Sequence, residues 1–115
     1  MKQRDRDRVE HIIKACHEIR QFCGDVDKNK MSEELILRRA VERDIVIIGE
    51  AANELSDSLK RKHSNLPWAD IVGMRNIIVH DYEHVSIDEL WDTIENDIPE
   101  LIDYFEDMLG KEERN

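Results

Sequence analysis

The sequence predicts an all-α protein: an up-and-down bundle of four main helices that forms a single domain over residues 1–115. Apolar residues make up 40% of the chain and charged residues 38%, with only four glycines and two prolines. That balance is typical of helices with one buried face and differs from that of disordered chains or β-sandwiches. The apolar residues also recur three and four positions apart, which is the spacing of an amphipathic helix.

The first helix is expected from about Arg4 to Phe22, with Gly24 ending it. Its apolar stripe consists of Val9, Ile12, Ile13, Cys16, Ile19 and Cys23. A disulfide between the two cysteines along one helix is geometrically out of reach. Both are therefore expected to be small core residues of a protein in a reducing compartment.

The second helix is expected to begin at Ser32, whose side chain can cap it, with Met31 and Ile36 packing together across the cap. Further along, the run Ile45–Ile48 is apolar on every side of the helix, so it must be covered on more than one side. In so small a domain we expect the second cover to come from a second subunit. A glycine inside a helix costs about 1 kcal/mol relative to alanine, so Gly49 indicates that another helix approaches closely there.

The third helix is expected to begin near Pro67, because proline suits a first turn. The fourth is expected to begin after Ser86, whose side chain can cap its first turn. Pro99 lies inside the fourth helix and should kink it near Glu95. The tail from about residue 111 is expected to be frayed.

The formal net charge of −10 argues against a protein that coats nucleic acid by charge alone, because backbone neutralisation needs clustered lysines and arginines. A small, locally basic RNA site stays open. Two basic clusters are present, one at Lys2, Arg4, Arg6 and Arg8 and the other at Arg38, Arg39 and Arg43. The favoured interpretation of both is a solvated helix face.

The sequence gives no indication of contact with a membrane. No apolar run approaches the ~20 residues of a transmembrane span. The N-terminal segment lacks the apolar stretch of a signal peptide. We therefore expect a cytoplasmic protein.

The most informative residues close the third helix, in the stretch Met74–Tyr82. Arginine is the fork-shaped, permanently charged binder of phosphate, and histidine moves protons near neutral pH. Arg75 and His80 are therefore a minimal set for attacking a phosphodiester without a metal. Arg75 is also centred on an apolar stripe, where it must pair with an acid such as Glu50 or Glu54, face a phosphate, or do both.

The geometry of an ideal helix limits how these residues act together. Asn76 and His80 lie one turn apart on a common face, whereas His80 lies about 140° around the helix from Arg75. Two arrangements stay open: the helix loosens before Asp81, or the same helix of a second subunit completes the site, as two-fold dimers allow. The apolar stripe around Arg75 consists of Trp68, Ile71, Val72, Val79 and Tyr82.

Other chemistries have little support in the sequence. His80 and His84 have the spacing of a zinc protease motif, but no glutamate follows His80. A di-metal site in a helical bundle needs two Glu-x-x-His pairs, and the chain has none. No Ser-His-Asp set and no glycine-rich phosphate loop are present. We therefore predict no metal and no cofactor.

Several segments in a fixed order resemble the HepT-like branch of the HEPN superfamily. They are Ile48–Ala52 in the second helix, Leu66–Trp68 at the start of the third, Gly73–Tyr82 at its end, and Leu90–Trp91 and Ile98–Leu101 in the fourth. The family motif R-x4-H-x-Y corresponds to Arg75, His80 and Tyr82. The segments span most of the chain after the first loop, and the first helix adds little to the match.

The resemblance implies a HEPN-like bundle that dimerises, with the two motifs facing each other across a cleft. It implies a metal-independent endoribonuclease that cuts RNA and acts as a toxin. It also implies a partner, a minimal nucleotidyltransferase antitoxin, that silences the toxin by transferring AMP onto the motif tyrosine, here Tyr82. A higher assembly of the homodimer with this antitoxin stays open.

On this interpretation His80 acts as general base or acid on the ribose 2′-hydroxyl or the leaving 5′-oxygen, and Arg75 stabilises the charge on the phosphorane. Asn76 supports the site by holding the imidazole or a phosphate oxygen, and Glu50 supports it by pairing with Arg75. The alternative function is a non-catalytic helical binding module that partners a nucleotidyltransferase. The acidic net charge favours that alternative.

Overall fold

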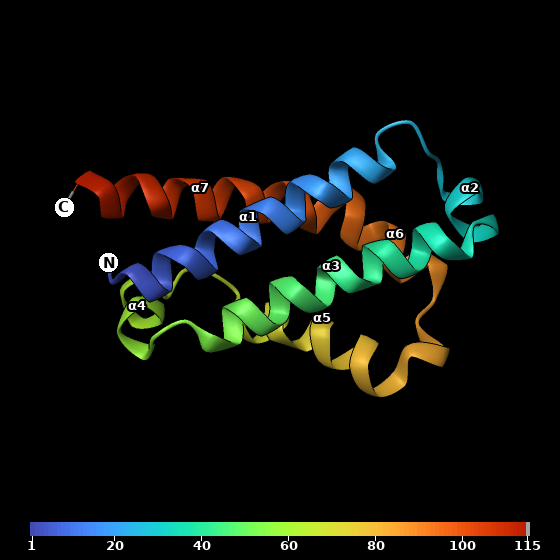
Figure 1. Ribbon diagram of the computed structural model, residues 1–115. Coiled ribbons are helices and arrows are strands. Elements are labelled where there is room, and N and C mark those ends of the chain that lie inside the picture. Colours follow the sequence, from blue (N-terminus) through green and yellow to red (C-terminus); the bar gives the residue numbers. More distant parts are fainter. Residues whose placement is uncertain (115) are drawn as a thin grey trace.

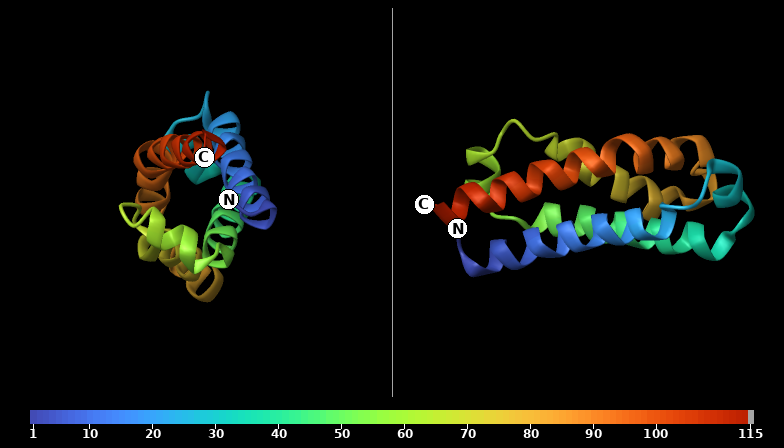
Figure 2. Two further views of the ribbon diagram at one scale, coloured as in Figure 1. Left: turned by 90° about the vertical axis from the view of Figure 1, so that its left-hand side faces the viewer. Right: turned by 90° about the horizontal axis from the view of Figure 1, so that it is seen from above.

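The computed structural model describes residues 1–114 as a bundle of helices, with no strand in that range. Four long helices form the bundle: α1 (Gln3–Cys23), α3 (Leu35–Glu54), α5 (Trp68–Asp81) and α7 (Ile98–Arg114). They run back and forth along its long axis, and both ends of the chain lie at the same end of the bundle (Figure 1, Figure 2). The predicted all-α bundle of four main helices is therefore confirmed.

Short helical segments connect the long ones. They are α2 (Lys28–Glu33), α4 (Asp57–Lys62), the 3-10 turn η1 (Tyr82–His84), α6 (Ile87–Asp92) and the π-helical turn η2 (Thr93–Asp97). The core between the long helices is mostly aliphatic, and Phe105 is its largest fully buried side chain. The ring of Trp68 meets Phe105 edge-on, with 5.8 Å between the centroids, and so holds the start of α5 against α7.

The first helix forms as predicted and turns its apolar stripe into the core. Cys16 and Cys23 are both buried and unbridged. Burial raises the pKa of the Cys16 thiol to about 12, and the nearby Asp44 adds to that effect. Burial also raises the pKa of Cys23 to about 11. Neither thiol is therefore ionised near neutral pH, and both act as core residues.

The start of the second predicted helix differs from the prediction. Asp27 rather than Ser32 forms the cap: its carboxylate accepts a hydrogen bond from the Lys30 backbone N–H at 2.8 Å and opens the short helix α2. Ser32 lies inside α2, and α3 follows as a separate helix. Met31 is fully buried whereas Ile36 is 88% exposed, so these two side chains do not pack together across a cap.

Helix α3 packs against α1 on one side and α5 on the other (Figure 1). The run Ile45–Ile48 is buried at every position except Ile47, which is half-buried. The prediction that a second subunit covers this run is therefore wrong, because helices of the same chain supply both covers. The predicted close approach at Gly49 is confirmed, since a Cβ atom there would lie 2.2 Å from the Cβ of Arg75.

The fourth predicted helix is divided into α6 and α7 by the turn η2. Ser86 caps α6 as predicted, and its Oγ accepts a hydrogen bond from the Glu89 backbone N–H at 3.0 Å. Pro99 lies in the first turn of α7 and lacks the N–H that would bond to the carbonyl of Glu95. Over Thr93–Asp97 the hydrogen bonding widens to the π-helical pattern, at the level of Glu95 where Pro99 was predicted to kink the helix.

The C-terminal segment is helical as far as Arg114, although fraying was predicted from about residue 111. Glu112 is only 6% exposed there. Its carboxylate accepts a hydrogen bond from Lys62 Nζ at 3.0 Å, and His63 Nε2 lies 3.1 Å from its other oxygen. These contacts lower the pKa of Glu112 to about 2 and hold the end of α4 against α7.

Candidate functional site

Arg75 lies on α5 opposite Gly49 of α3, where the two helices pack closely. The absent side chain of Gly49 leaves room for the arginine stem. From there the guanidinium donates a hydrogen bond from Nη1 to Oδ1 of Asn76 at 2.9 Å. Its Nη2 lies 3.7 Å from Oε1 of Glu50, so Glu50 is the acid that pairs with it. The other predicted partner, Glu54, contacts an arginine of α1 instead.

The Arg75–Glu50 pair borders an open hollow of about 330 Å³ between α3 and α5. The residues around it are Glu50, Asn53, Glu54, Val72, Arg75 and Asn76. The side chains of Arg75 and Glu50 are 29% and 49% exposed, so solvent weakens their attraction. A guanidinium carries five N–H donors. The contacts of Arg75 with Asn76 and Glu50 therefore leave donors for an anion in the hollow.

The apolar stripe around Arg75 is less buried than an amphipathic helix predicts. Only Ile71 is buried, while Val79 is 42% exposed and Tyr82 53% exposed. The neighbouring Ile77 is 52% exposed as well. The last turns of α5 therefore present apolar side chains to solvent instead of to the core of their own chain. Apolar surface of this kind is typical of a face that contacts another molecule.

His80 is exposed in the last turn of α5. The helix stays α-helical through Asp81, and the tighter turn η1 begins only at Tyr82. It therefore does not loosen before Asp81, which was one of the two predicted arrangements. His80 consequently stays about 140° around α5 from Arg75. In the described part of the chain, the amide oxygen of Asn76 bonds to Arg75 and no hydrogen bond joins Asn76 to His80.

Tyr82 opens η1, and an arginine of α3 lies over its ring. The Cζ atom of Arg39 is 5.8 Å from the ring centroid, within the range of a cation–π contact. Arg39 also donates a hydrogen bond from Nη1 to Oε1 of Glu42 at 2.6 Å. The phenol hydroxyl of Tyr82 makes a long contact of 3.5 Å with Oε1 of Glu83. The sequence placed Arg39 in a basic cluster but gave no signal that it would meet the motif tyrosine.

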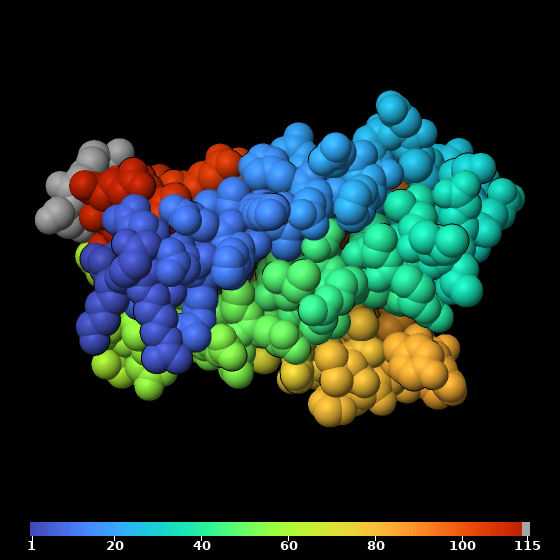
Figure 3. Space-filling model, in the orientation of Figure 1, coloured from blue at the N-terminus to red at the C-terminus, as the bar shows by residue number. Residues whose placement is uncertain are grey.

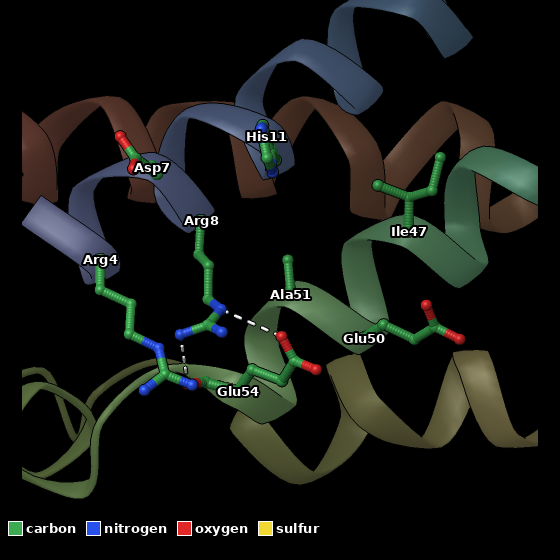
Figure 4. A pocket seen from close by; sticks show the side chains of 8 residues that line it. All are labelled: Arg4, Asp7, Arg8, His11, Ile47, Glu50, Ala51 and Glu54. Carbon is green, nitrogen blue, oxygen red and sulfur yellow. Dashed lines mark hydrogen bonds and ion pairs between the residues drawn. The ribbon is translucent and has the colours of Figure 1, made fainter.

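A larger hollow of about 560 Å³ lies on the other flank of α3, facing α1 (Figure 4). Its lining consists of Arg4, Asp7, Arg8, His11, Ile47, Glu50, Ala51 and Glu54. Arg8 reaches across it and donates hydrogen bonds to Oε2 of Glu54 at 3.0 Å and to its backbone carbonyl at 3.2 Å (Figure 4). Glu50 and Glu54 line both hollows, so these two acids lie between the arginines of α1 and Arg75.

Within residues 1–114, histidine, cysteine and acidic side chains do not gather in groups of three or more that could hold a metal ion. His84 of the HxxxH pair contacts the carboxylate of Asp81. Over the same range, no helix combines the length and the apolar content that crossing a bilayer requires.

The chain is similar to known proteins over most of its length. A family model described as "Ribonuclease HepT-like" matches residues 12–108, a range that includes α3, α5 and the R-x4-H-x-Y motif. The chain is 35% identical to "Putative RNase TTE0752" of Caldanaerobacter subterraneus subsp. tengcongensis, over 90% of this chain and 93% of that protein. It is 32% identical to "Probable ribonuclease HepT" of Thermococcus cleftensis, over 94% of this chain and 98% of that protein. No solved structure matches the chain.

Proposed function

This chain belongs to the HepT-like ribonuclease family, and on that premise we propose that it is a metal-independent endoribonuclease and the toxin of a toxin–antitoxin pair. One observation carries the proposal. Arg75 and His80 both reach solvent from one regular helix, yet they point to different sides of it. A single chain therefore does not aim both side chains at one phosphodiester. A second copy of the chain completes the site.

The exposed apolar residues of α5 support this dimer. Ile77, Val79 and Tyr82 lie in the same turns as His80 and provide apolar surface for a second copy to bury. In a two-fold dimer whose axis passes near these turns, this apolar surface of one subunit packs against the same surface of the partner subunit. Arg75 of one subunit then faces His80 of the partner subunit across a shared cleft.

The residues fit cleavage by the ribose 2′-hydroxyl. His80 removes the proton from this hydroxyl as its oxygen attacks the phosphorus. The bond from phosphorus to the 5′-oxygen breaks, and the imidazolium returns the proton to this oxygen by way of water. The products are a 2′,3′-cyclic phosphate and a 5′-hydroxyl end. Arg75 donates hydrogen bonds to the phosphorane oxygens, with Glu50 and Asn76 holding its guanidinium. Proton transfer by a placed residue contributes about 10²–10⁴-fold to the rate, and electrostatic stabilisation usually contributes more.

Tyr82 gives this site a means of control. Its side chain is 53% exposed, so its hydroxyl can attack the α-phosphorus of ATP held by a nucleotidyltransferase partner and release pyrophosphate. AMP on Tyr82 would add bulk and a negative phosphate near the cleft, where it repels the RNA backbone. A minimal nucleotidyltransferase antitoxin is therefore the partner that we propose.

The second candidate function is a non-catalytic binding module that holds a nucleotidyltransferase. The net charge of −10 favours it, because an acidic surface repels RNA and attracts a basic partner protein. It differs from the ribonuclease in one respect that can be measured: it predicts no RNA cleavage by the isolated chain.

The test is cleavage of total RNA and tRNA by the purified protein in excess EDTA. The wild type and a His17→Ala control, which removes an exposed histidine of α1, should both cut and leave 2′,3′-cyclic phosphate ends. His80→Ala should not cut while keeping the same helical circular dichroism spectrum. Cleavage that survives in His80→Ala rejects the assignment. An inactive wild type whose intact mass shows no AMP favours the binding module.

A further inference from the structure

The second basic cluster, at Arg38, Arg39 and Arg43, has no part in the motif chemistry, yet the fold brings one of its members to the motif. Helices α3 and α5 pack side by side with Gly49 opposite Arg75 and Arg39 opposite Tyr82. The two helices are therefore antiparallel, and Arg39 lies ten residues, about 15 Å of helix, from the level of Arg75. Figure 3 shows the corresponding parts of α3 and α5 meeting at the surface.

One nitrogen of the Arg39 guanidinium is hydrogen-bonded within the protein, and about half of the side chain is exposed to solvent. Its Nη1 bonds to Glu42, whose side chain is only 5% exposed, while the Arg39 side chain is 49% exposed. The other carboxylate oxygen of Glu42 is buried without a partner in the described part of the chain. Glu42 therefore fixes Arg39 over the Tyr82 ring and leaves its remaining N–H donors facing solvent.

The charge of this segment is opposite to that of the whole protein. The chain carries a net charge of −10, so an RNA strand needs a local cationic surface in order to approach it. Residues 38–43 supply three arginines against one glutamate, and that glutamate is buried. An aromatic ring beside a cation is the combination that binds single-stranded RNA, because the base stacks on the ring while the cation holds the backbone.

We propose that Arg39 is a backbone-binding residue of the RNA site: it holds a phosphate beside the motif while the Tyr82 ring supports the neighbouring base. This inference rests on the proposed ribonuclease function. It extends the site beyond R-x4-H-x-Y, along the α3–α5 face from Arg75 to Arg39. The bound strand then covers Tyr82, so RNA and AMP on that tyrosine exclude each other.

The test measures binding of a fluorescent single-stranded RNA oligonucleotide of mixed sequence to His80→Ala, which holds the substrate uncut. Arg39→Gln is added to this parent, because glutamine retains an N–H donor for the buried Glu42 and loses the charge. The matched control is Arg61→Gln, an exposed arginine of α4 at the opposite end of the bundle from η1 (Figure 1).

Arg39→Gln should raise Kd about five- to tenfold and lower the slope of log Kd against log salt by about 0.7, as the loss of one phosphate contact to a single strand does. Arg61→Gln should leave both unchanged. Tyr82→Leu should weaken binding without changing the salt slope, because it removes a stacking surface and no charge. In the wild-type background, Arg39→Gln should raise KM and change kcat little.

Equal binding by Arg39→Gln and Arg61→Gln, with weaker binding by Arg75→Gln, overturns the assignment of Arg39 and leaves the ribonuclease intact. An unchanged KM in the Arg39→Gln single variant leads to the same conclusion. If the unmodified wild type does not cut RNA and His80→Ala does not bind it, both the ribonuclease function and the role of Arg39 are overturned. Loss of a nucleotidyltransferase complex in Arg39→Gln, with RNA binding unchanged, assigns this surface to a protein partner instead.

Discussion

Gly49 and Arg75 lie so close that no side chain fits between α3 and α5 at their level. A Cβ atom on Gly49 would lie 2.2 Å from the Cβ of Arg75 and 2.9 Å from its Cγ. The Cβ is bonded directly to the backbone of α5, so rotation of the arginine side chain cannot relieve the overlap. The glycine therefore fixes how closely the two helices pack and the position from which the Arg75 side chain extends.

Gly49→Ala should destabilise the protein and reduce RNA cleavage more than the lost stability explains. Overpacking of this kind costs about 1–3 kcal/mol, and the better helix propensity of alanine offsets about 1 kcal/mol of it. Chemical denaturation and the cleavage rate of the folded protein measure the two effects.

Gly73→Ala is the matched control, because nothing lies within 4 Å of a Cβ built at that position of α5. It should be neutral or slightly stabilising. A Gly49→Ala protein as stable and as active as Gly73→Ala would contradict the close packing.

Asp44 makes the stability of the protein depend on pH between about pH 4 and 7. Asp44 is only 3% exposed, and burial, together with the nearby carboxylate of Glu18, raises its pKa to about 7. A raised pKa means that the folded state binds the proton more tightly than the unfolded state. The contribution of Asp44 to the free energy of unfolding is therefore fully present below its ordinary pKa of 3.8. It decreases as pH rises and is lost once the pH passes about 7.

The Tm of the wild type should therefore fall as pH rises from about 4 to about 7, and Asp44→Asn should remove much of that fall. Asp25→Asn, which changes an exposed acid in the loop after α1, should keep the wild-type profile. Parallel pH profiles for the wild type and Asp44→Asn would show that Asp44 is not protonated in the folded state.

Glu112 should stabilise the protein with the opposite dependence on pH. Hydrogen bonds from Lys62 and His63 lower its pKa to about 2, so its contribution is complete above the ordinary value of 4.5 and is lost as pH falls through about 2. Glu112→Gln should lower Tm near pH 7, and this difference should narrow in acid. Glu113→Gln changes a neighbouring exposed acid and should have little effect. Equal Tm values for both variants near pH 7 would contradict the account.

Tyr82→Phe should separate catalysis from control. The variant keeps the ring and loses the hydroxyl, so it should cut RNA but gain no mass when incubated with the nucleotidyltransferase partner and ATP. The wild type should gain one or more AMP units and lose activity. Mass gain in Tyr82→Phe would place the modification on another residue, and an unmodified wild type would remove this form of control.

Features with a local signal were predictable from the sequence. Gly49 indicated a close helix approach, which the structure confirms. Pro99 indicated a kink near Glu95, and the helix takes the π-helical form of η2 at that level. The cap of the second predicted helix was less certain, because Asp27 and Ser32 lie five positions apart and both residue types cap helices. The hydrogen bond from the Lys30 backbone N–H to the Asp27 carboxylate identifies Asp27 as the cap.

Features that depend on which helices meet were not predictable. Helices α1 and α5 cover the run Ile45–Ile48, and no pattern in the sequence of α3 indicates which helices do so. The contact between Arg39 and Tyr82 joins residues 43 positions apart, and it requires the antiparallel register of α3 and α5. The exposure of Val79 reverses the expectation from helical periodicity, because the stripe on α5 turns away from the core near its end.

The central claim is that Arg75 of one subunit and His80 of the partner subunit act on the same phosphodiester. The most direct measurement is RNA cleavage in EDTA by a mixed dimer that combines one Arg75→Ala subunit and one His80→Ala subunit, co-expressed with different tags and purified through both. Each variant alone should be inactive. The mixed dimer retains one intact site of two, so it should show about half the wild-type activity per dimer. A mixed dimer as inactive as its parents would show that both residues must come from the same chain.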